Sequence, residues 1–252
     1  MKITILGSGT CVPRLARSSS SVLVRAGDKA LVFDTGPGTI RRLLEAGTEP
    51  GRVSAYFYTH LHPDHSADFV PMLFAAKYGR EIRRPFSVAA GQGFSGFYEA
   101  LKIAYGHWIE LDPAILSIKE LSVDGPDSLD FSGVTVKSLP VLHTPASLAY
   151  RVEEAGGKSL VISGDTDYCE NLVELTRGCD MFICEAALPD ELKVEGHLTP
   201  SLTGRIASEA GVGRLVLTHI YPECDAVDII AQCRRTWAGP LTVATDLMEL
   251  SL

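Results

Sequence analysis

Short apolar runs alternate with helical patterns along the chain of 252 residues. The runs are rich in Val, Ile, Leu and aromatic residues and are bounded by turn residues, a pattern that favours buried strands. We expect strands at 2–6, 20–24, 29–33, 54–58, 86–90, 134–141, 148–154, 159–163, 181–185, 214–218 and 241–245. The segments between them predict helices at 39–47, at 64–79 with a kink at Pro71, after Thr199-Pro200, and at 226–237.

No linker, low-complexity tract or charge block interrupts this alternation, so we expect a single domain that spans residues 1–252. Strands that alternate with helices are typical of an α/β fold. Two segments also resemble each other weakly, because ILGSGT at 5–10 and VISGDT at 161–166 both end a strand in a Gly/Ser turn. This similarity suggests that one half of the fold is duplicated.

Composition and charge narrow the class of protein. The chain is 46% hydrophobic and 21% charged, and its net charge of −8 disfavours a broad, non-specific hold on polyanions. We find no apolar run near the roughly 18 residues of a membrane span, and the start MKITILGSG has too short an apolar stretch for a signal peptide. Six Cys without CxxC spacing predict reduced thiols. We therefore expect a cytoplasmic protein without a membrane partner.

The segment THLHPDH, residues 59–65, crowds together side chains that can bind a metal ion or move a proton. In an extended segment His60 and His62 project to the same face, so they can hold one ion. Pro63 ends the extended segment, and Asp64 and His65 then turn toward a second position at the start of a helix. The spacing thus predicts ligands for two neighbouring positions.

Further side chains of this kind end other predicted strands, where a sheet edge fixes their positions. Together with the first segment they make seven ligand-type groups, which suits two divalent ions that share a carboxylate. The predicted ligands are His60, His62 and His143 for one ion and Asp64, His65 and His219 for the other, with Asp165 bridging. Zinc is the expected metal, with manganese as the alternative. Asp34 either braces the ligand loop through a hydrogen bond or is a plain turn residue.

The ordered motifs THLHPDH, LPVLHT, ISGDT and LTHIYP resemble those of the metallo-β-lactamase superfamily over nearly the whole chain. This resemblance implies a metal-dependent hydrolase with an αββα sandwich, in which two mixed β-sheets are flanked by helices. The segments ILGSGTCVPRLARSSSSVLV, LVFDTGPGT, CEAALPD and EGHLTP are similar to those of the ribonuclease Z and phosphodiesterase branch. By that similarity Glu185 orients His197, which contacts the scissile phosphate or protonates the leaving oxygen.

The sequence departs from that branch at two places. It reads His197-Leu198-Thr199 where the family usually has His-Ser-Thr. His143 and Asp165 are also only 22 positions apart (165 − 143), where ribonuclease Z typically inserts a Gly/Pro-rich arm that clamps tRNA. A plain hairpin around Gly156-Gly157 is expected there instead. We therefore do not expect tight tRNA binding.

The leading functional hypothesis is a phosphodiesterase that acts on a small cyclic or nucleotide phosphodiester, or on short RNA. A metal-bridging hydroxide oriented by Asp64 would be the nucleophile. The alternative is a hydrolase of carboxylic esters, thioesters or lactones with the same site, and a more remote one is a non-catalytic, metal-bound interaction module. The sequence leaves open whether the protein forms a homodimer.

Two other groups of residues have two readings each. Basic residues either form a phosphate-binding rim or are solvated on the surface, as is usual at helix ends. They are Lys77, Arg80, Arg83 and Arg84 in one segment, and Arg14 and Arg17 in the first loop. The aromatic segment 93–108, which includes His107, either forms a wall of the pocket or belongs to the core.

Overall fold

Two β-sheets form the centre of the structure, a computed structural model that describes residues 1–79 and 84–252. The strands of the first sheet are β1 (Lys2–Gly7), β2 (Ser21–Ala26), β3 (Lys29–Phe33), β4 (Ala55–Phe57), β5 (Phe86–Gly91), β6 (Leu116–Leu121) and β14 (Met248–Ser251). Their spatial order is β14-β1-β2-β3-β4-β5-β6. The pairs from β14 to β3 are antiparallel and those from β3 to β6 are parallel, so this sheet is mixed.

The second sheet repeats this pattern. Its strands are β7 (Asp127–Phe131), β8 (Val134–Pro140), β9 (Leu148–Glu154), β10 (Ser159–Ile162), β11 (Met181–Glu185), β12 (Leu215–Thr218) and β13 (Leu241–Val243). They lie in chain order, antiparallel from β7 to β10 and parallel from β10 to β13. The expected duplication is therefore present. However, β10 occupies the place of β3, and β8 occupies the place of β1. ILGSGT and VISGDT are therefore not equivalent segments of the two halves, as their similarity had suggested.

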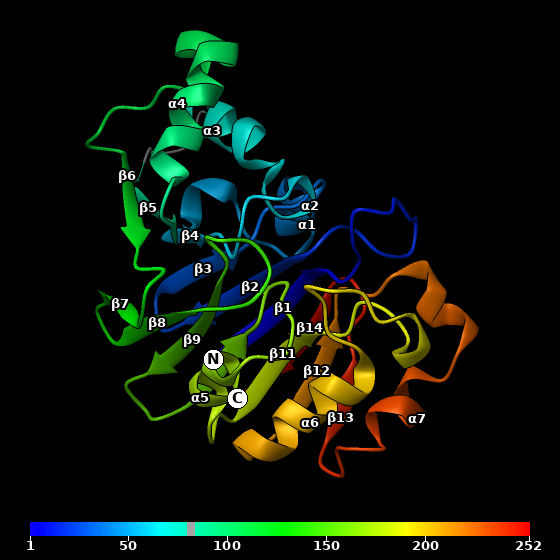
Figure 1. The fold of residues 1–252 in the computed structure, drawn as a ribbon. Helices are drawn as coiled ribbons and strands as arrows, with labels where there is room; N and C mark the ends of the chain where they lie inside the picture. The colour runs from blue at the N-terminus through cyan, green and yellow to red at the C-terminus, as the bar shows by residue number, and fades with distance from the viewer. Residues whose placement is uncertain (80–83) are drawn as a thin grey trace.

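Helices cover the outer faces of both sheets (Figure 1). Beside the first sheet lie α1 (Thr39–Glu45), α2 (Pro63–Ser66), α3 (Phe69–Tyr78) and α4 (Phe94–Tyr105), and beside the second lie α5 (Glu170–Thr176), α6 (Pro200–Ala210) and α7 (Ile229–Cys233). Short 3-10 helices are η1 (Pro50–Arg52), η2 (Gly106–Trp108), η3 (Asp190–Leu192) and η4 (Pro222–Ala226). This layering confirms the predicted αββα sandwich.

The inner faces of the two sheets pack through aromatic rings. Phe33 and Phe57 stack with their ring centroids 4.8 Å apart, and both contact Tyr150 of β9. All three side chains are buried, and burial of each contributes roughly 1.5–3 kcal/mol. On the outer face of the first sheet, Phe94 of α4 packs against Tyr58 with their ring centroids 5.2 Å apart. The start of the aromatic segment 93–108 therefore belongs to the core.

The predicted helix 64–79 is two helices, because the chain breaks between α2 and α3 at Ala67 and Asp68. The Asp68 amide donates to the Thr35 carbonyl at 2.9 Å, and its carboxylate accepts from the Ile40 amide at 3.0 Å. These bonds tie the break to the loop between β3 and α1. Pro71 lies in the first turn of α3, where its missing N–H removes no intrahelical bond. The expected kink at Pro71 is therefore absent.

Three strands, β6, β7 and β14, are not predicted by the hydrophobic pattern. β6 and β7 have few buried positions, so their apolar alternation is weak. β14 returns to the first sheet and pairs antiparallel with β1, far from its neighbours in sequence. The hairpin expected at Gly156-Gly157 is present between β9 and β10, with Gly157 at a φ of 84°. That positive φ suits glycine, which has no Cβ.

Candidate metal centre

The segment 59–65 follows β4 and enters α2. His62 precedes the helix and Pro63 is its first residue, one position before the predicted start at Asp64. The loop between β3 and α1 packs tightly against this turn. A Cβ on Gly36 would lie 2.1 Å from the backbone oxygen of Asp64, so only glycine permits this approach.

A first group of ligand-type side chains comes from both sheets. It consists of His60, His62, His143 and Asp165, whose ligand atoms all lie within 4.8 Å of one another. His62 Nδ1 lies 3.1 Å from His143 Nε2, and His60 Nε2 lies 3.7 Å from Asp165 Oδ2. His62 is exposed while His60 is buried. The group therefore opens to solvent on the side of His62.

A second group lies directly beside the first and consists of Asp64, His65 and His219. The Nε2 atoms of His65 and His219 are 3.4 Å apart. Asp64 Oδ2 is 3.5 Å from His219 Nε2 and 3.8 Å from His65 Nε2. All three residues are buried. The structure thus brings the seven predicted residues together in the two sets that their spacing predicts.

Asp165 lies between the two groups and presents one oxygen to each. Its Oδ2 faces His60 and His143, at 3.7 and 3.9 Å. Its Oδ1 faces the Nε2 atoms of His65 and His219, at 3.3 and 3.4 Å. Oδ1 and His60 Nε2 are buried without a hydrogen-bond partner, although buried polar atoms normally have one. Imidazole nitrogens and carboxylate oxygens in this arrangement fit two divalent ions with one shared carboxylate.

Asp34 follows β3. Of the two alternatives that the sequence left open, its contacts are those of a residue that braces the ligand loop. One carboxylate oxygen accepts from the Thr59 amide at 2.8 Å, and the other accepts from the Thr59 hydroxyl at 2.8 Å. The second oxygen also lies 2.8 Å from His65 Nδ1. Because Asp34 engages Nδ1, the Nε2 atom of His65 stays directed at Asp165. Asp34 adopts this position with a φ of 61°, a conformation that Asp tolerates better than most residues.

The electrostatics of the two groups differ. Burial lowers the pKa of His60 well below its usual value and also lowers that of His143, so both rings are neutral near pH 7, as metal ligands must be. Burial also opposes protonation of His65, but the charges of Asp165 and Asp34 outweigh it and raise its pKa well above the usual value. Burial likewise works against ionisation of Asp165, yet His219 and His65 hold its pKa well below the usual range. A metal ion held by the second group would therefore have to displace the proton of His65.

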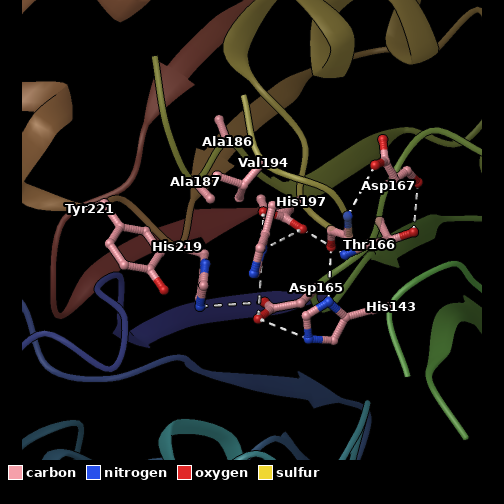
Figure 2. Close-up of polar contacts among 12 residues, drawn as sticks. His143, Asp165, Thr166, Asp167, Ala186, Ala187, Val194, His197, His219 and Tyr221 are labelled. Carbon is pink, nitrogen blue, oxygen red and sulfur yellow. Dashed lines mark hydrogen bonds and ion pairs between the residues drawn. The ribbon is translucent and has the colours of Figure 1, made fainter. Parts of the chain in front are cut away.

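His197 lies beside Asp165 and His219 at the edge of this cluster (Figure 2) and meets the carboxylate of Glu185. His197 Nδ1 lies 3.1 Å from one oxygen of the fully buried Glu185, and the other oxygen accepts from the Thr166 amide at 2.5 Å. His197 Nδ1 is also 3.9 Å from Asp165 Oδ2. Burial lowers the pKa of His197, but the hydrogen bond and the charge of Glu185 outweigh it, so that the pKa lies above the usual value.

The first loop lines a pocket of about 300 Å³ that reaches Asp64. Of its two arginines, Arg17 donates to the Ser8 hydroxyl at 2.7 Å and to the Ala244 carbonyl at 2.6 Å. Arg14 pairs with Asp225. Both guanidinium groups thus have protein partners, and the bonds of Arg17 hold the loop against the body of the protein.

The described members of the other basic cluster, Lys77 and Arg84, are not brought to the centre, and Arg84 lines a separate pocket beside Glu49 and Phe86. Arg80 and Arg83 lie outside the described residues. Lys77 donates to the His107 carbonyl near the far end of α3, about 12 Å along the helix from Phe69. His107 itself is exposed, and its ring lies against Trp108.

Three residues near the centre were missed from the sequence. Asp167 and Gly196 make hydrogen bonds around His197, and Tyr221 places its ring 5.8 Å from the ring of His219. Each lies within two positions of a predicted site residue. This closeness in sequence was the only sign that they would lie near the centre. A neighbour in sequence can point in any direction, so that signal is weak.

Comparison with known proteins identifies the family. A model of the Beta-lactamase superfamily domain matches residues 29–220. The chain belongs to this superfamily. It is 31% identical over 245 residues to a ribonuclease Z of Mycobacterium bovis, with 88% of this chain and 86% of the relative covered. The predicted resemblance to the ribonuclease Z branch is thereby confirmed.

Solved structures of the superfamily share the fold. The short form of human tRNase Z superposes with a TM-score of 0.78 at 25% identity, covering 100% of this chain and 99% of that one. The metallo-beta-lactamase fold protein YhfI of Bacillus subtilis superposes with a TM-score of 0.85 at 21% identity, covering 99% and 98% of the two chains. By its family, the chain of 252 residues is a metal-dependent hydrolase, and its His/Asp cluster is suited to divalent ions.

The structure also bears on the cysteines and on whether any helix could cross a membrane. All six cysteines lie within the described ranges and are free thiols. In residues 1–79 and 84–252, no helix combines the length and the apolar character that crossing a membrane would require.

Proposed function

We propose that the protein is a phosphodiesterase that hydrolyses a small cyclic or nucleotide phosphodiester, or short RNA, at the centre around Asp165. The pair of His197 and Glu185 carries this proposal. The Nδ1 atom of an imidazole oriented by a buried carboxylate lies 3.9 Å from the proposed bridging ligand, so the ring borders the proposed ion site. Cleavage of a phosphodiester releases an alkoxide, and a positioned proton donor assists that step.

The proposed metal ligands are the two sets described above, with Asp165 shared. Zinc is the proposed metal, because imidazole-rich sets suit it. Two divalent ions held here would supply an acidified water and would offset charge on the phosphoryl oxygens. Burial opposes ionisation of Asp64, but the hydrogen bond and charge of His219 keep its pKa below the usual value. Asp64 is therefore an ionised carboxylate that can accept a hydrogen bond from the attacking water.

His197 is the proposed proton donor. Its Nδ1 faces Glu185, so Nε2 is the atom left to serve the leaving oxygen. The raised pKa of His197 favours the protonated imidazole, which is the form that a general acid requires. Glu185 also stabilises the cationic ring until the proton is given up.

The surroundings of the centre favour a small substrate. The pocket beside Asp64 has a volume of about 300 Å³, at the low end of the range for small-molecule sites. Two basic residues near the centre, Arg14 and Lys193, are each paired with a carboxylate of the protein. Such pairing reduces their attraction for a long polyanion, whose binding depends on many cation contacts.

A substrate panel tests the proposal. Metal-reconstituted protein is assayed with bis(p-nitrophenyl) phosphate, p-nitrophenyl acetate and an acyl thioester, each over the same range of concentrations. We expect the highest kcat/KM with the phosphodiester. A kcat/KM that is clearly higher for the carboxylic ester or the thioester would instead assign the site to ester hydrolysis, and no turnover of any of them would leave only a binding function.

A further inference from the structure

The segment that carries His197, residues 193–197, is attached to the rest of the protein through Asp167. One carboxylate oxygen of Asp167 accepts from the Gly196 amide at 3.0 Å and from Lys193 Nζ at 2.7 Å. The other oxygen accepts from the amide of the next residue, Tyr168, at 2.8 Å. Two of these bonds span 29 and 26 residues of sequence. Asp167 therefore joins two loops that lie far apart in the chain (Figure 2).

Asp167 is itself held firmly. Its amide donates to the Leu142 carbonyl at 2.7 Å, and its carbonyl accepts from the Thr166 hydroxyl at 2.7 Å. Its carboxylate accepts a charge-assisted hydrogen bond from Lys193 Nζ and hydrogen bonds from two backbone amides. The contact to residues 193–197 thus has a rigid base.

The same loop also touches a proposed metal ligand. The Gly196 carbonyl accepts from His143 Nδ1 at 2.9 Å, so one peptide segment links His143 to Asp167. Gly196 has a φ of 81°, and a Cβ there would lie 3.1 Å from His143 Nδ1. Glycine is therefore required both by the conformation and by the close approach.

The bond from His197 to Glu185 fixes one point of the imidazole ring but not the path of the chain that carries it. The backbone amide of His197 contributes only a 3.4 Å contact to the Val194 carbonyl. Without Asp167, the loop could shift while the bond to Glu185 persists, and the ring would then pivot about that bond. Proton transfer requires donor and acceptor at hydrogen-bond distance in the correct orientation.

We propose that Asp167 is a positioning residue that holds residues 193–197 so that His197 can protonate the leaving oxygen. This inference rests on the proposed phosphodiesterase function. The proton passes from the imidazolium to the oxygen whose bond to phosphorus breaks, and the neutral alcohol leaves. Asp167 takes no part in that transfer.

The test compares two phosphodiesters that differ in their leaving group. A p-nitrophenyl group leaves readily as an anion, whereas an alkyl group needs the proton. We expect Asp167→Ala to lower kcat for the alkyl ester by about tenfold and to change kcat for the nitrophenyl ester by less than about twofold, with metal content unchanged. Lys193→Met is the matched control. It removes the ion pair but keeps the Gly196 bond, so it should lower kcat for the alkyl ester by clearly less than Asp167→Ala does.

A second measurement does not depend on activity. Amide hydrogen exchange, followed by mass spectrometry, should show faster exchange in Asp167→Ala within residues 193–197 and unchanged exchange in β10 and β11. An equal loss on both esters, no loss on the alkyl ester, or unchanged exchange of the segment would overturn the inference. If the wild-type protein cleaves neither ester, the proposed function fails, and with it the catalytic part of this inference. The exchange result then still decides whether Asp167 holds the segment.

Discussion

The phosphodiesterase proposal depends on a single imidazole, that of His197. We expect His197→Ala to lower turnover of an alkyl phosphodiester by about a hundredfold or more, the size of effect typical of a lost proton donor. Metal content should not change, because His197 belongs to neither ligand set. Steady-state kinetics together with metal analysis of the purified variant check both statements.

His107→Ala is the matched control for this variant, because His107 is an exposed histidine at the far end of α4. It should retain wild-type turnover. If His197→Ala also keeps wild-type turnover, or if it loses metal, His197 is not the proton donor.

The pH dependence tests the partner of His197. Glu185 raises the pKa of His197 against the opposing effect of burial. A proton donor loses activity as the pH rises through its pKa. Glu185→Gln removes the charge that holds the proton, so the pKa falls, and the alkaline limb of the kcat profile should move to lower pH. A limb that stays in place would show that Glu185 does not set the protonation of His197.

At the scale of residues, the sequence predicted which side chains cluster together better than it predicted the residues that support them. The seven ligand-type residues follow strands whose apolar runs are readable, so their convergence at one edge followed from the pattern. The choice between two readings of Asp34 depended on its three contacts and on its φ of 61°. Asp167 and Gly196 act through loop backbone, and loop conformation leaves no periodic signal in a sequence.

Strand ends from both sheets supply the candidate ligands, and this arrangement predicts the metal stoichiometry. We expect two ions per chain, because Asp165 offers one oxygen to each group. Anomalous diffraction from crystals of metal-reconstituted protein should show two peaks separated by about 4 Å or less. A single peak, or two peaks much further apart, would rule out a shared carboxylate.

The close contact between the β3–α1 loop and α2 predicts a sensitive glycine. In Gly36→Ala the new methyl group would meet the Asp64 carbonyl at 2.1 Å, so the loop must move. We expect the free energy of unfolding to fall by about 1–3 kcal/mol, as in other overpacked sites, and metal content to fall with it. Denaturant titration and metal analysis measure both.

Gly51→Ala serves as the control for that change, because nothing lies within 4 Å of a Cβ at Gly51. Its stability should stay within about 0.5 kcal/mol of wild type. Equal stability of the two variants would mean that the loop tolerates displacement.

Helix boundaries were less predictable than strands at the scale of elements. The break between α2 and α3 depends on bonds from Asp68 to a loop that lies earlier in the chain, and Pro71 gave a misleading signal. β14 could not be assigned to the first sheet, because its partner β1 lies at the other end of the sequence. Long-range pairing of this kind is invisible to local periodicity.

For the whole molecule, we predict poor processing of precursor tRNA. The chain forms a plain hairpin between β9 and β10, at the place where a clamp would be inserted, and it carries a net charge of −8. Recognition of folded tRNA requires a basic surface remote from the scissile bond, and binding there also positions that bond. The kcat/KM for precursor tRNA at physiological salt should therefore fall well below that for a small chromogenic phosphodiester.

The tRNA comparison uses the same metal-reconstituted protein for both substrates, with His197→Ala as the blank for each. Efficient, site-specific removal of the 3′ trailer would overturn the prediction. That result would mean that a second subunit or another surface supplies the binding energy.

Two other expectations from the sequence stay predictions. They are that residues 1–252 form a single domain and that the protein is cytoplasmic.

The repeated strand pattern has a consequence for how the two halves stay together. With the proposed ions bound, each ion would join ligands from the first half, at 60–65, to a histidine from the second half, His143 or His219. Neither half could complete either coordination shell alone. The ions would then act as non-covalent cross-links between two similar halves, and their binding free energy would add to that of folding. A chelator would thus remove catalysis and, with it, part of the cooperativity that makes the halves unfold as one.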